Sequence, residues 1–454
     1  MSMKKLFDVD KHNLLFHNKA LFALLIPIVV EQLLNSFMGM VDTMMVSNLG
    51  SQAISGVSLV DSVNNLIVQL FSAMATGAAI ICSHYIGMRN KDGANKAARQ
   101  VVLTVMVISL AITILGLIFR RPLLTLIFGH VEQEVMDNAV DYFLFTALSY
   151  PFLALFSAGS AIFRSCGNSR YPMMVSVISN VFNIGGNALL MFVFKLGVSG
   201  AAISTLVSRV FCMVVIFIAL SKPKLDIVVK DYADIRPDFG LIKSILAIGV
   251  PSGIENSMFQ FGKLAIQSTV STLGTAAIAA QAMTNILENV NGIFGIGVGM
   301  CLMTVVGQTL GAGRKEEAKY YIVKLAGIAE LGIIASCLLV YAFAGPITRL
   351  GGMETDSARM CIEMVGAITI VKPLVWVLSF VPAYGMRAAG DVKFSMITSI
   401  ITMWGCRVAL SIALIRIFGM GPIGVWYGMF ADWTIRGIIF TTRFFSGRWV
   451  KKVI

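Results

Sequence analysis

Two carboxylates lie inside one long apolar stretch near the start of this chain. The stretch, residues 26–50, reads IPIVVEQLLNSFMGMVDTMMVSNLG and carries Glu31 and Asp42. At about 100° per residue, their spacing of eleven places them within about 20° of one another on one helical face, with Asn35 and Met38 between them. A proline four residues before Glu31 frees a backbone carbonyl, and a carboxylate beside it suits a cation or proton site. The alternative is a buried acid that bridges to a neighbouring helix.

Three asparagines form a second polar face farther along the chain. Asn180, Asn183 and Asn187 follow the spacing i, i+3, i+7 in the stretch SVISNVFNIGGNALLMF. Their neutral amide oxygens suit a monovalent cation that is also bound by one carboxylate. Hydrogen bonding between helices explains the same asparagines equally well.

Further charged residues interrupt other apolar stretches. Asp61 and Glu288 are predicted to line the mouth of a cavity, with a purely structural role as the alternative. Lys263, Lys372 and Arg407 are expected to pair with buried acids or to shape a cavity, rather than to bind a substrate. Such residues are costly in a bilayer, by roughly 2.5–3.5 kcal/mol each at the centre of a helix, so each requires a partner or a function.

The elements that carry these residues are predicted to cross a membrane. Mean hydropathy is +0.82, and only 13% of residues are charged, against about 25% in soluble domains. A membrane-spanning helix needs about 20 apolar residues. The chain divides into twelve such stretches: 20–47, 54–86, 98–119, 139–162, 172–194, 198–220, 242–271, 278–310, 320–345, 359–383, 394–418 and 421–441.

The basic residues are distributed unevenly between the two sides of these spans. The formal net charge is +12, and most Lys and Arg fall in the even-numbered breaks and at both ends of the chain. This is the positive-inside bias, so both termini are predicted to be cytoplasmic. The charge therefore indicates membrane orientation, and nucleic acid is not an expected partner.

The sequence repeats itself at an offset of about 224 residues. Pro27 matches Pro251, Glu31 matches Glu255, and VSNLGSQAI matches VSTLGTAAI. The most polar long stretch separates the copies. We therefore predict an N-terminal lobe at 1–220, a cytoplasmic linker at 221–240 and a C-terminal lobe at 241–454. Six spans in each lobe give both lobes the same orientation, which is a transporter architecture with the binding site between lobes.

Several catalytic chemistries are missing from the sequence. It contains no GxxxxGK[ST] phosphate-binding loop, no HExxH motif and no cysteine cluster with metal-ligand spacing. We therefore expect neither an enzyme nor a cofactor. Uphill transport by such a chain must draw on an ion gradient.

Four motifs together resemble the multidrug and toxic compound extrusion (MATE) family: VDTMMVSNLG, GQTLGAG, FRSCGNSRYP and GVSGAAIST. The resemblance covers nearly the whole chain. It implies an all-α polytopic membrane protein with 12 transmembrane helices in two pseudo-symmetric six-helix lobes arranged as a V. It also implies export of cationic or amphipathic compounds in exchange for Na⁺ or H⁺. By the same resemblance, the cation site comprises Asp42, Asn183, Asn187 and Thr205, with Na⁺ as one possible ion.

The resulting hypothesis is a bacterial inner-membrane exporter, monomeric, that alternates between outward-open and inward-open states. Glu31 joins the coupling site, and Glu31 and Glu255 supply negative potential for a cationic substrate. The side chains expected to face the substrate are Glu31, Asn35, Met38, Asp61, Asn180, Glu255 and Glu288. The alternative is a flippase for lipid-linked precursors, which favours a basic cavity; Lys263, Lys372 and Arg407 keep it open.

Overall fold

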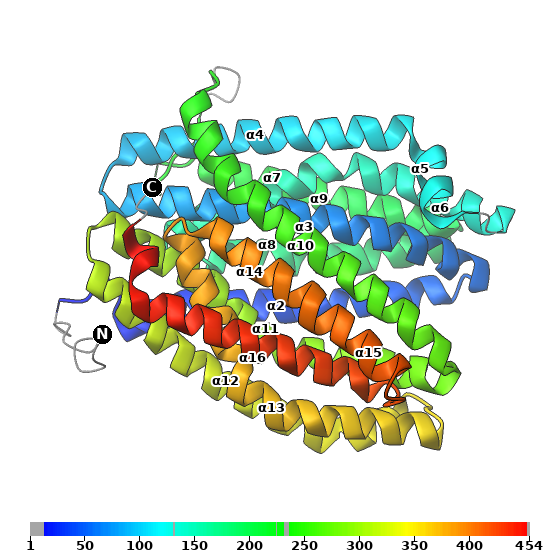
Figure 1. Cartoon of the computed structure of the whole chain (residues 1–454). Helices are drawn as coiled ribbons and strands as arrows, with labels where there is room; N and C mark the ends of the chain where they lie inside the picture. The colour runs from blue at the N-terminus through cyan, green and yellow to red at the C-terminus, as the bar shows by residue number, and fades with distance from the viewer. Residues whose placement is uncertain (1–12, 130–131, 224, 231–235, 452–454) are drawn as a thin grey trace. The chain divides into compact units, whose positions relative to one another are not determined.

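The computed structural model describes residues 13–129, 132–223, 225–230 and 236–451 (Figure 1). The described residues form helices, turns and loops but no strand, which confirms the predicted all-α class. In chain order the helices, including π-helical and 3₁₀ segments marked η, are α2 (Asn18–Ser47), α3 (Ser51–Gly87), α4 (Lys91–Ile118), α5 (Arg120–Phe128), α6 (Gln133–Leu148), α7 (Tyr150–Ser165), α8 (Arg170–Asn187), η1 (Ala188–Val193), α9 (Gly197–Leu220), α10 (Phe239–Val270), η3 (Ser271–Leu273), α11 (Thr275–Gly311), α12 (Lys315–Leu350), α13 (Thr355–Ala388), α14 (Val392–Thr402), η4 (Met403–Leu410), α15 (Ser411–Arg416), α16 (Ile423–Ser446) and η5 (Arg448–Lys451).

The helices match the predicted membrane spans in position. Within the described residues, nine spans are long and apolar enough to cross a bilayer, and α6 with α7, bent by 43°, makes up to ten. The two remaining predicted spans fall on α10 and α16, which carry charged residues in their middle. The chain is thus a multi-pass membrane protein, and the count of twelve spans stays a prediction.

The described chain forms two compact units. The N-terminal unit comprises Lys19–Gly253, and the C-terminal unit comprises the described residues up to Asn18 together with those from Ile254 onward. One helix, α10, therefore contributes its first part to one unit and its second part to the other. The lobe boundaries at 220 and 241 stay a prediction.

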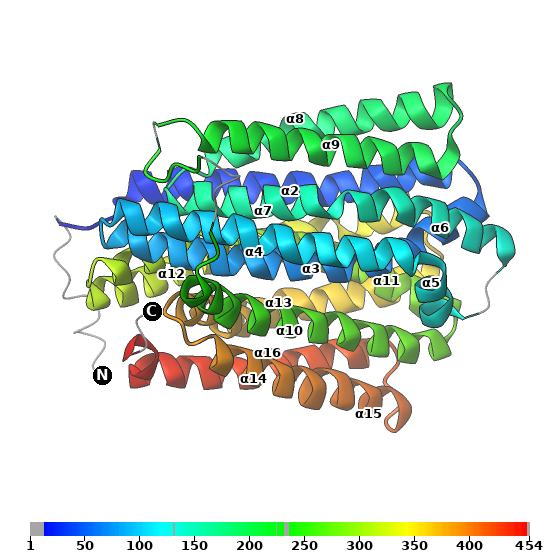
Figure 2. The ribbon, with the colours of Figure 1, turned by 90° about the horizontal axis from the view of Figure 1, so that it is seen from above.

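In the N-terminal unit, α3 packs against α4, α6 and α7, and α9 packs against α6, α7 and α8. Figure 2 shows α8 and α9 side by side. Glycines bring α3 and the first part of α10 together: a Cβ at Gly77 would lie 3.0 Å from the Ile245 carbonyl oxygen, and one at Gly249 would lie 3.0 Å from Met74 Sδ. Small residues at such contacts let helix backbones approach closely in a membrane.

In the C-terminal unit, α11, α12 and α13 pack on one another, and α16 packs on α13. The segment before α2 belongs to this unit and is held by α12. The Leu15 amide donates to Glu317 Oε1 at 2.5 Å, and the Phe16 amide donates to the Tyr321 hydroxyl at 2.7 Å. The start of the described chain is therefore anchored to the C-terminal unit.

The repeat is visible in the helices themselves. Helices α3 and α11 each have 37 residues, and their bounds differ by 224. Each follows a glycine with positive φ, 109° at Gly50 and 95° at Gly274, which other residues rarely adopt. Each half also contains a π-helical segment, η1 or η4, at the place of its fifth span. Such segments often occur at functional sites.

Candidate functional site

The polar face of α2 lies along α8. Ser176 donates a hydrogen bond to Glu31 Oε1 at 3.4 Å, and Asn187 donates one to Asp42 Oδ1 at 2.7 Å. Both pairs are separated by 145 residues, so the two helices run parallel with matching register at these contacts. The eleven-residue spacing of the two carboxylates is therefore a spacing along one helix–helix contact.

The structure brings together the four residues of the predicted cation site in one chain of side chains. Beyond its contact with Asp42, Asn187 Nδ2 lies 3.3 Å from Asn183 Oδ1, and Asn183 Nδ2 donates to Thr205 Oγ1 at 3.3 Å. Asn187 is 1% exposed. Its Oδ1 has no hydrogen-bond partner among the described residues. The site thus places the Asp42 carboxylate beside neutral amide and hydroxyl oxygens. One of these, Asn187 Oδ1, can still accept a hydrogen bond or bind a cation.

A glycine next to Asn187 sets the distance between α8 and α9. A Cβ at Gly186 would collide with the side chain of Ser204, whereas a Cβ at the neighbouring Gly185 would meet nothing within 4 Å. Ser204 also donates to the Asn183 carbonyl oxygen at 3.0 Å. The close approach therefore holds the two asparagines of α8 against Thr205 of α9.

Glu31 is 4% exposed and lies 3.9 Å from the guanidinium of Arg164 on α7. These contacts agree with the alternative of a buried acid that bridges to a neighbouring helix. The other predicted residues nearby differ in exposure: Asn35 is exposed and Met38 is half-buried. The Nδ2 of Asn180 is buried, with no hydrogen-bond partner in the described part of the chain.

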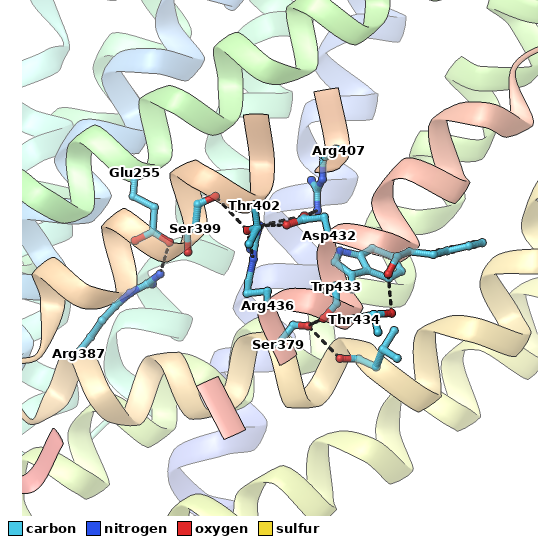
Figure 3. Close-up of polar contacts among 12 residues, drawn as sticks. Glu255, Ser379, Arg387, Ser399, Thr402, Arg407, Asp432, Trp433, Thr434 and Arg436 are labelled. Atoms are coloured by element: carbon cyan, nitrogen blue, oxygen red, sulfur yellow. Dashed lines mark hydrogen bonds and ion pairs between the residues drawn. The ribbon is translucent and has the colours of Figure 1, made fainter. Parts of the chain in front are cut away.

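The second half repeats this acid–arginine pair. Glu255 is 2% exposed, and its Oε1 lies 2.6 Å from Arg387 (Figure 3). The two glutamates are 224 residues apart in sequence and the two arginines, Arg164 and Arg387, are 223 apart. Sequence reasoning missed both arginines, although the match of FRSCGNSRYPM with MRAAGDVKFSM at this offset aligns them.

Asp61 belongs to a separate network in the N-terminal unit. Asn64 donates to Asp61 at 3.3 Å, and the Tyr150 hydroxyl donates to Asn64 Oδ1 at 2.6 Å. Arg209 on α9 donates to the Ser149 hydroxyl at 2.6 Å and lies within electrostatic range of Asp42 and Asp61.

The C-terminal unit has a different set of ion pairs. Asp432 lies 2.7 Å from Arg407 and 2.6 Å from Arg436 (Figure 3), and Glu288 lies 2.6 Å from Lys372. The expected pairing of Lys372 and Arg407 with buried acids is thus confirmed. Asp432 was not singled out in the sequence, although its spacing of four from Arg436 in one span is a readable signal. Arg436 is 1% exposed, so its guanidinium is packed inside the C-terminal unit.

Comparisons with known proteins agree with one another. The sequence model of the family described as MatE matches residues 27–189 and 251–413. The chain is 28% identical to the uncharacterized transporter YisQ of Bacillus subtilis, with 95% of each chain covered. It is 25% identical to the probable multidrug resistance protein NorM of Thermotoga maritima, covering 96% of this chain and 94% of that one. A solved outward-facing MATE multidrug resistance transporter superposes with a TM-score of 0.89 at 20% identity, covering 99% and 98%.

Proposed function

Because this chain belongs to the MatE family of membrane transporters, we propose that it is a secondary active multidrug exporter. It exchanges Na⁺ or H⁺, moving inward, for cationic and amphipathic compounds, moving outward. It is a transporter rather than an enzyme, as its family is. NorM of Thermotoga maritima and the solved MATE transporter, both described as multidrug resistance proteins, support the substrate class. The bacterial sources of YisQ and NorM support a location in a bacterial plasma membrane.

The observation that carries the proposal is the contact of Asp42 with Asn187 in the N-terminal unit. One carboxylate, two amide groups and the hydroxyl of Thr205 offer hard oxygen ligands of low total charge. Oxygen ligands suit Na⁺, and the carboxylate alone suits a proton. The unpartnered Asn187 Oδ1 is an acceptor that an incoming cation or proton carrier would satisfy.

Binding at Asp42 would change the charge between α2 and α8. With the carboxylate neutralised, its hydrogen bond from Asn187 loses its ionic character and weakens. The ion couples to transport only when the two transport states bind it with different affinity. Glu31 and Glu255 contribute less negative potential than their sequence positions suggest, because each lies beside an arginine.

Efflux from proteoliposomes tests the proposal. A cationic dye is loaded, and a Na⁺ gradient or a pH gradient is imposed separately. We expect one gradient to drive efflux and Asp42→Asn to abolish it, while Asp137→Asn, which changes an exposed carboxylate, retains it. Efflux that Asp42→Asn leaves coupled to the gradient would refute the ion site.

The family match gives no support to the alternative of a flippase for lipid-linked precursors. A transport assay distinguishes that alternative from a multidrug exporter. If neither gradient moves a cationic dye, transbilayer movement of a lipid-linked anionic precursor is the assay to run next. Monomeric state and cytoplasmic termini are part of the proposal; the positive-inside distribution of Lys and Arg supports the latter.

A further inference from the structure

The C-terminal unit contains a cluster of cations that its carboxylates do not neutralise. We call Lys263, Lys372, Arg407 and Arg436 the basic cluster. Asp432 is shared by the two arginines, at 2.7 and 2.6 Å, and Glu288 pairs with Lys372 at 2.6 Å. Lys263 is exposed and lies within electrostatic range of Glu288 and Arg407. Four cations against two carboxylates leave an excess of positive charge in an apolar setting.

Two buried N–H donors in this region lack acceptors. Arg407 is 5% exposed and Trp433 is 1% exposed. Neither Arg407 Nε nor Trp433 Nε1 has a hydrogen-bond partner among the described residues. Buried donors in native proteins are nearly always paired, so each such exception calls for an explanation. An oxygen of a bound anion would supply the acceptor and would also reduce the charge excess.

An aromatic surface adjoins the same cations. The ring centroid of Phe259 lies 5.4 Å from the Arg407 guanidinium and 5.0 Å from that of Arg436. Phe259 is half-buried, and Lys263, one turn later on α10, is exposed. Residues four apart share a helix face. The accessible side of the basic cluster therefore presents an aromatic ring next to an ammonium group.

The internal repeat shows that this chemistry is opposite to that of the first half. Asp42 corresponds to Ile266 at the offset of 224, and Asn183 corresponds to Arg407. Helix α10 reaches Arg407 closely because Gly262 adjoins Met403 and Val408 of η4; a Cβ there would collide with the Met403 side chain. Where the N-terminal unit has ligands for a cation, the C-terminal unit has a cation.

We propose that the C-terminal unit binds an organic anion that carries an aromatic ring. Its carboxylate or phosphate oxygens bind Arg407 and Lys263, and its ring packs against Phe259. Arginine suits both oxyanions because its planar donors match their geometry. This inference adds a substrate class to the proposed exporter; it rests on that function for transport of the anion, but not for its binding.

Calorimetry on the full-length protein in nanodiscs of neutral lipid tests the binding. The probes are 1-naphthoate and 1-naphthyl phosphate, with 1-naphthamide and 1-naphthylmethylammonium as neutral and cationic controls of matched shape. We expect both anions to bind at least about tenfold more tightly than the amide, the gain typical of a hydrogen bond to a charged group. Equal affinity for all four probes would overturn the proposal.

Variants locate the site. Lys263→Gln removes the charge of an exposed side chain, so we expect the variant to fold. It should weaken the binding of both anions about tenfold. Arg407→Lys keeps a cation beside Asp432 but removes the planar guanidinium donors. It should therefore also weaken the binding of both anions. Lys243→Gln is the matched control, because it removes another exposed lysine of α10 that lies in the N-terminal unit. Unchanged anion affinity in Lys263→Gln and Arg407→Lys would overturn the assignment.

Two further arms separate the possible outcomes. Adding anionic phosphatidylglycerol to the nanodiscs tests for a lipid headgroup; if it displaces 1-naphthoate, the site is a lipid site and the assignment to an aromatic solute is wrong. Because binding is measured without a gradient, it is independent of dye efflux. Loss of coupled efflux with intact anion binding refutes only the proposed function, and the reverse result refutes only this inference.

Discussion

At the scale of single residues, Glu255 and Arg387 form a buried ion pair that the first half repeats in Glu31 and Arg164. Both carboxylates are nearly inaccessible, and one oxygen of each has no hydrogen-bond partner in the described part of the chain. Taking two charges out of water is costly, so such a pair need not stabilise the fold overall. Removing one partner is different, because the other charge then remains buried alone.

We therefore predict that Glu255→Gln lowers the free energy of unfolding by about 3–5 kcal/mol. Glu31→Gln should lower the free energy of unfolding by less. The Glu31 carboxylate lies 3.9 Å from the Arg164 guanidinium, whereas the Glu255 carboxylate lies 2.6 Å from that of Arg387. Denaturant titration in detergent would measure both. The double variant Glu255→Gln, Arg387→Met should recover part of the loss; a double variant less stable than the single one would contradict the explanation.

Residue positions also show what the sequence could predict and what it could not. The polar face of α2 follows from helical periodicity alone, and the contacts of Glu31 and Asp42 with α8 agree with it. The cation-site set came from resemblance to a family, since no spacing rule connects Asp42 with Asn187. The partners Arg164 and Arg387 were missed because pairing depends on which helices touch, which local sequence does not encode.

At the scale of elements, the contact between α8 and α9 depends on one glycine. Gly186→Ala places a methyl group against Ser204, so we predict that it separates α8 from α9 and weakens the Asn183–Thr205 contact. Overpacking of this kind typically costs about 1–3 kcal/mol. The ion concentration needed for half-maximal efflux should rise.

Gly185→Ala is the matched control for that variant. It adds the same methyl group one residue earlier, where nothing lies within 4 Å. Alanine is favoured over glycine in a helix interior by about 1 kcal/mol, so this variant should be as stable as the parent or more so. If Gly185→Ala impaired efflux as much as Gly186→Ala, close packing would not be the cause.

The start of α10 depends on Asp238, which lies before the helix. Its Oδ1 accepts hydrogen bonds from the amides of Gly240 and Leu241 at 3.0 and 3.2 Å, and Lys96 Nζ lies 2.6 Å from its Oδ2. The hydrogen bond from Lys96, with those backbone amides, holds the pKa of the Asp238 carboxyl below its usual value. A carboxyl whose pKa is lower in the folded chain stabilises the fold above its unfolded pKa, near 3.9.

We predict that Asp238→Ala lowers the thermal stability of the protein at neutral pH. The difference from the parent should shrink as pH falls below about 4 and through the folded pKa, because protonation removes the same interactions. Thermal unfolding at a series of pH values would measure it. Asp226→Ala, which removes an exposed carboxylate of the same loop 3.8 Å from Lys91, should show a smaller difference at neutral pH.

At the scale of the whole molecule, hydropathy predicted the helices well because the bilayer requires long apolar segments whatever their partners are. It could not predict the bend between α6 and α7 or the π-helical turns η1 and η4. The bend falls at Pro151 in the first turn of α7, which lacks an amide for helical hydrogen bonding, and the π-helical turns change the local hydrogen-bond pattern. Neither feature is visible in the average polarity of a segment. Charged residues within α10 and α16 lower the hydropathy of these two helices, so their crossing of the bilayer stays a prediction.

The orientation of the chain is a further prediction. In a background without reactive native cysteines, Lys222→Cys should react with a membrane-impermeant thiol reagent only in inside-out vesicles. Lys195→Cys, at the other end of α9, should react only from the outside of intact cells. Mass spectrometry of the labelled protein would measure both. Labelling of the two positions from the same side would contradict cytoplasmic termini.

Two short segments belong to a different compact unit from the rest of their half of the sequence. The residues just before α2 lie in the C-terminal unit, and Phe239–Gly253 lies in the N-terminal unit. A protease cut in the loop between α9 and α10 would thus leave two polypeptides, each holding a piece that completes the other. The two fragments would exchange these segments, as the protomers of a domain-swapped dimer do. Genes for the two fragments, expressed together, should yield an intact transporter whose parts copurify without a peptide bond between them.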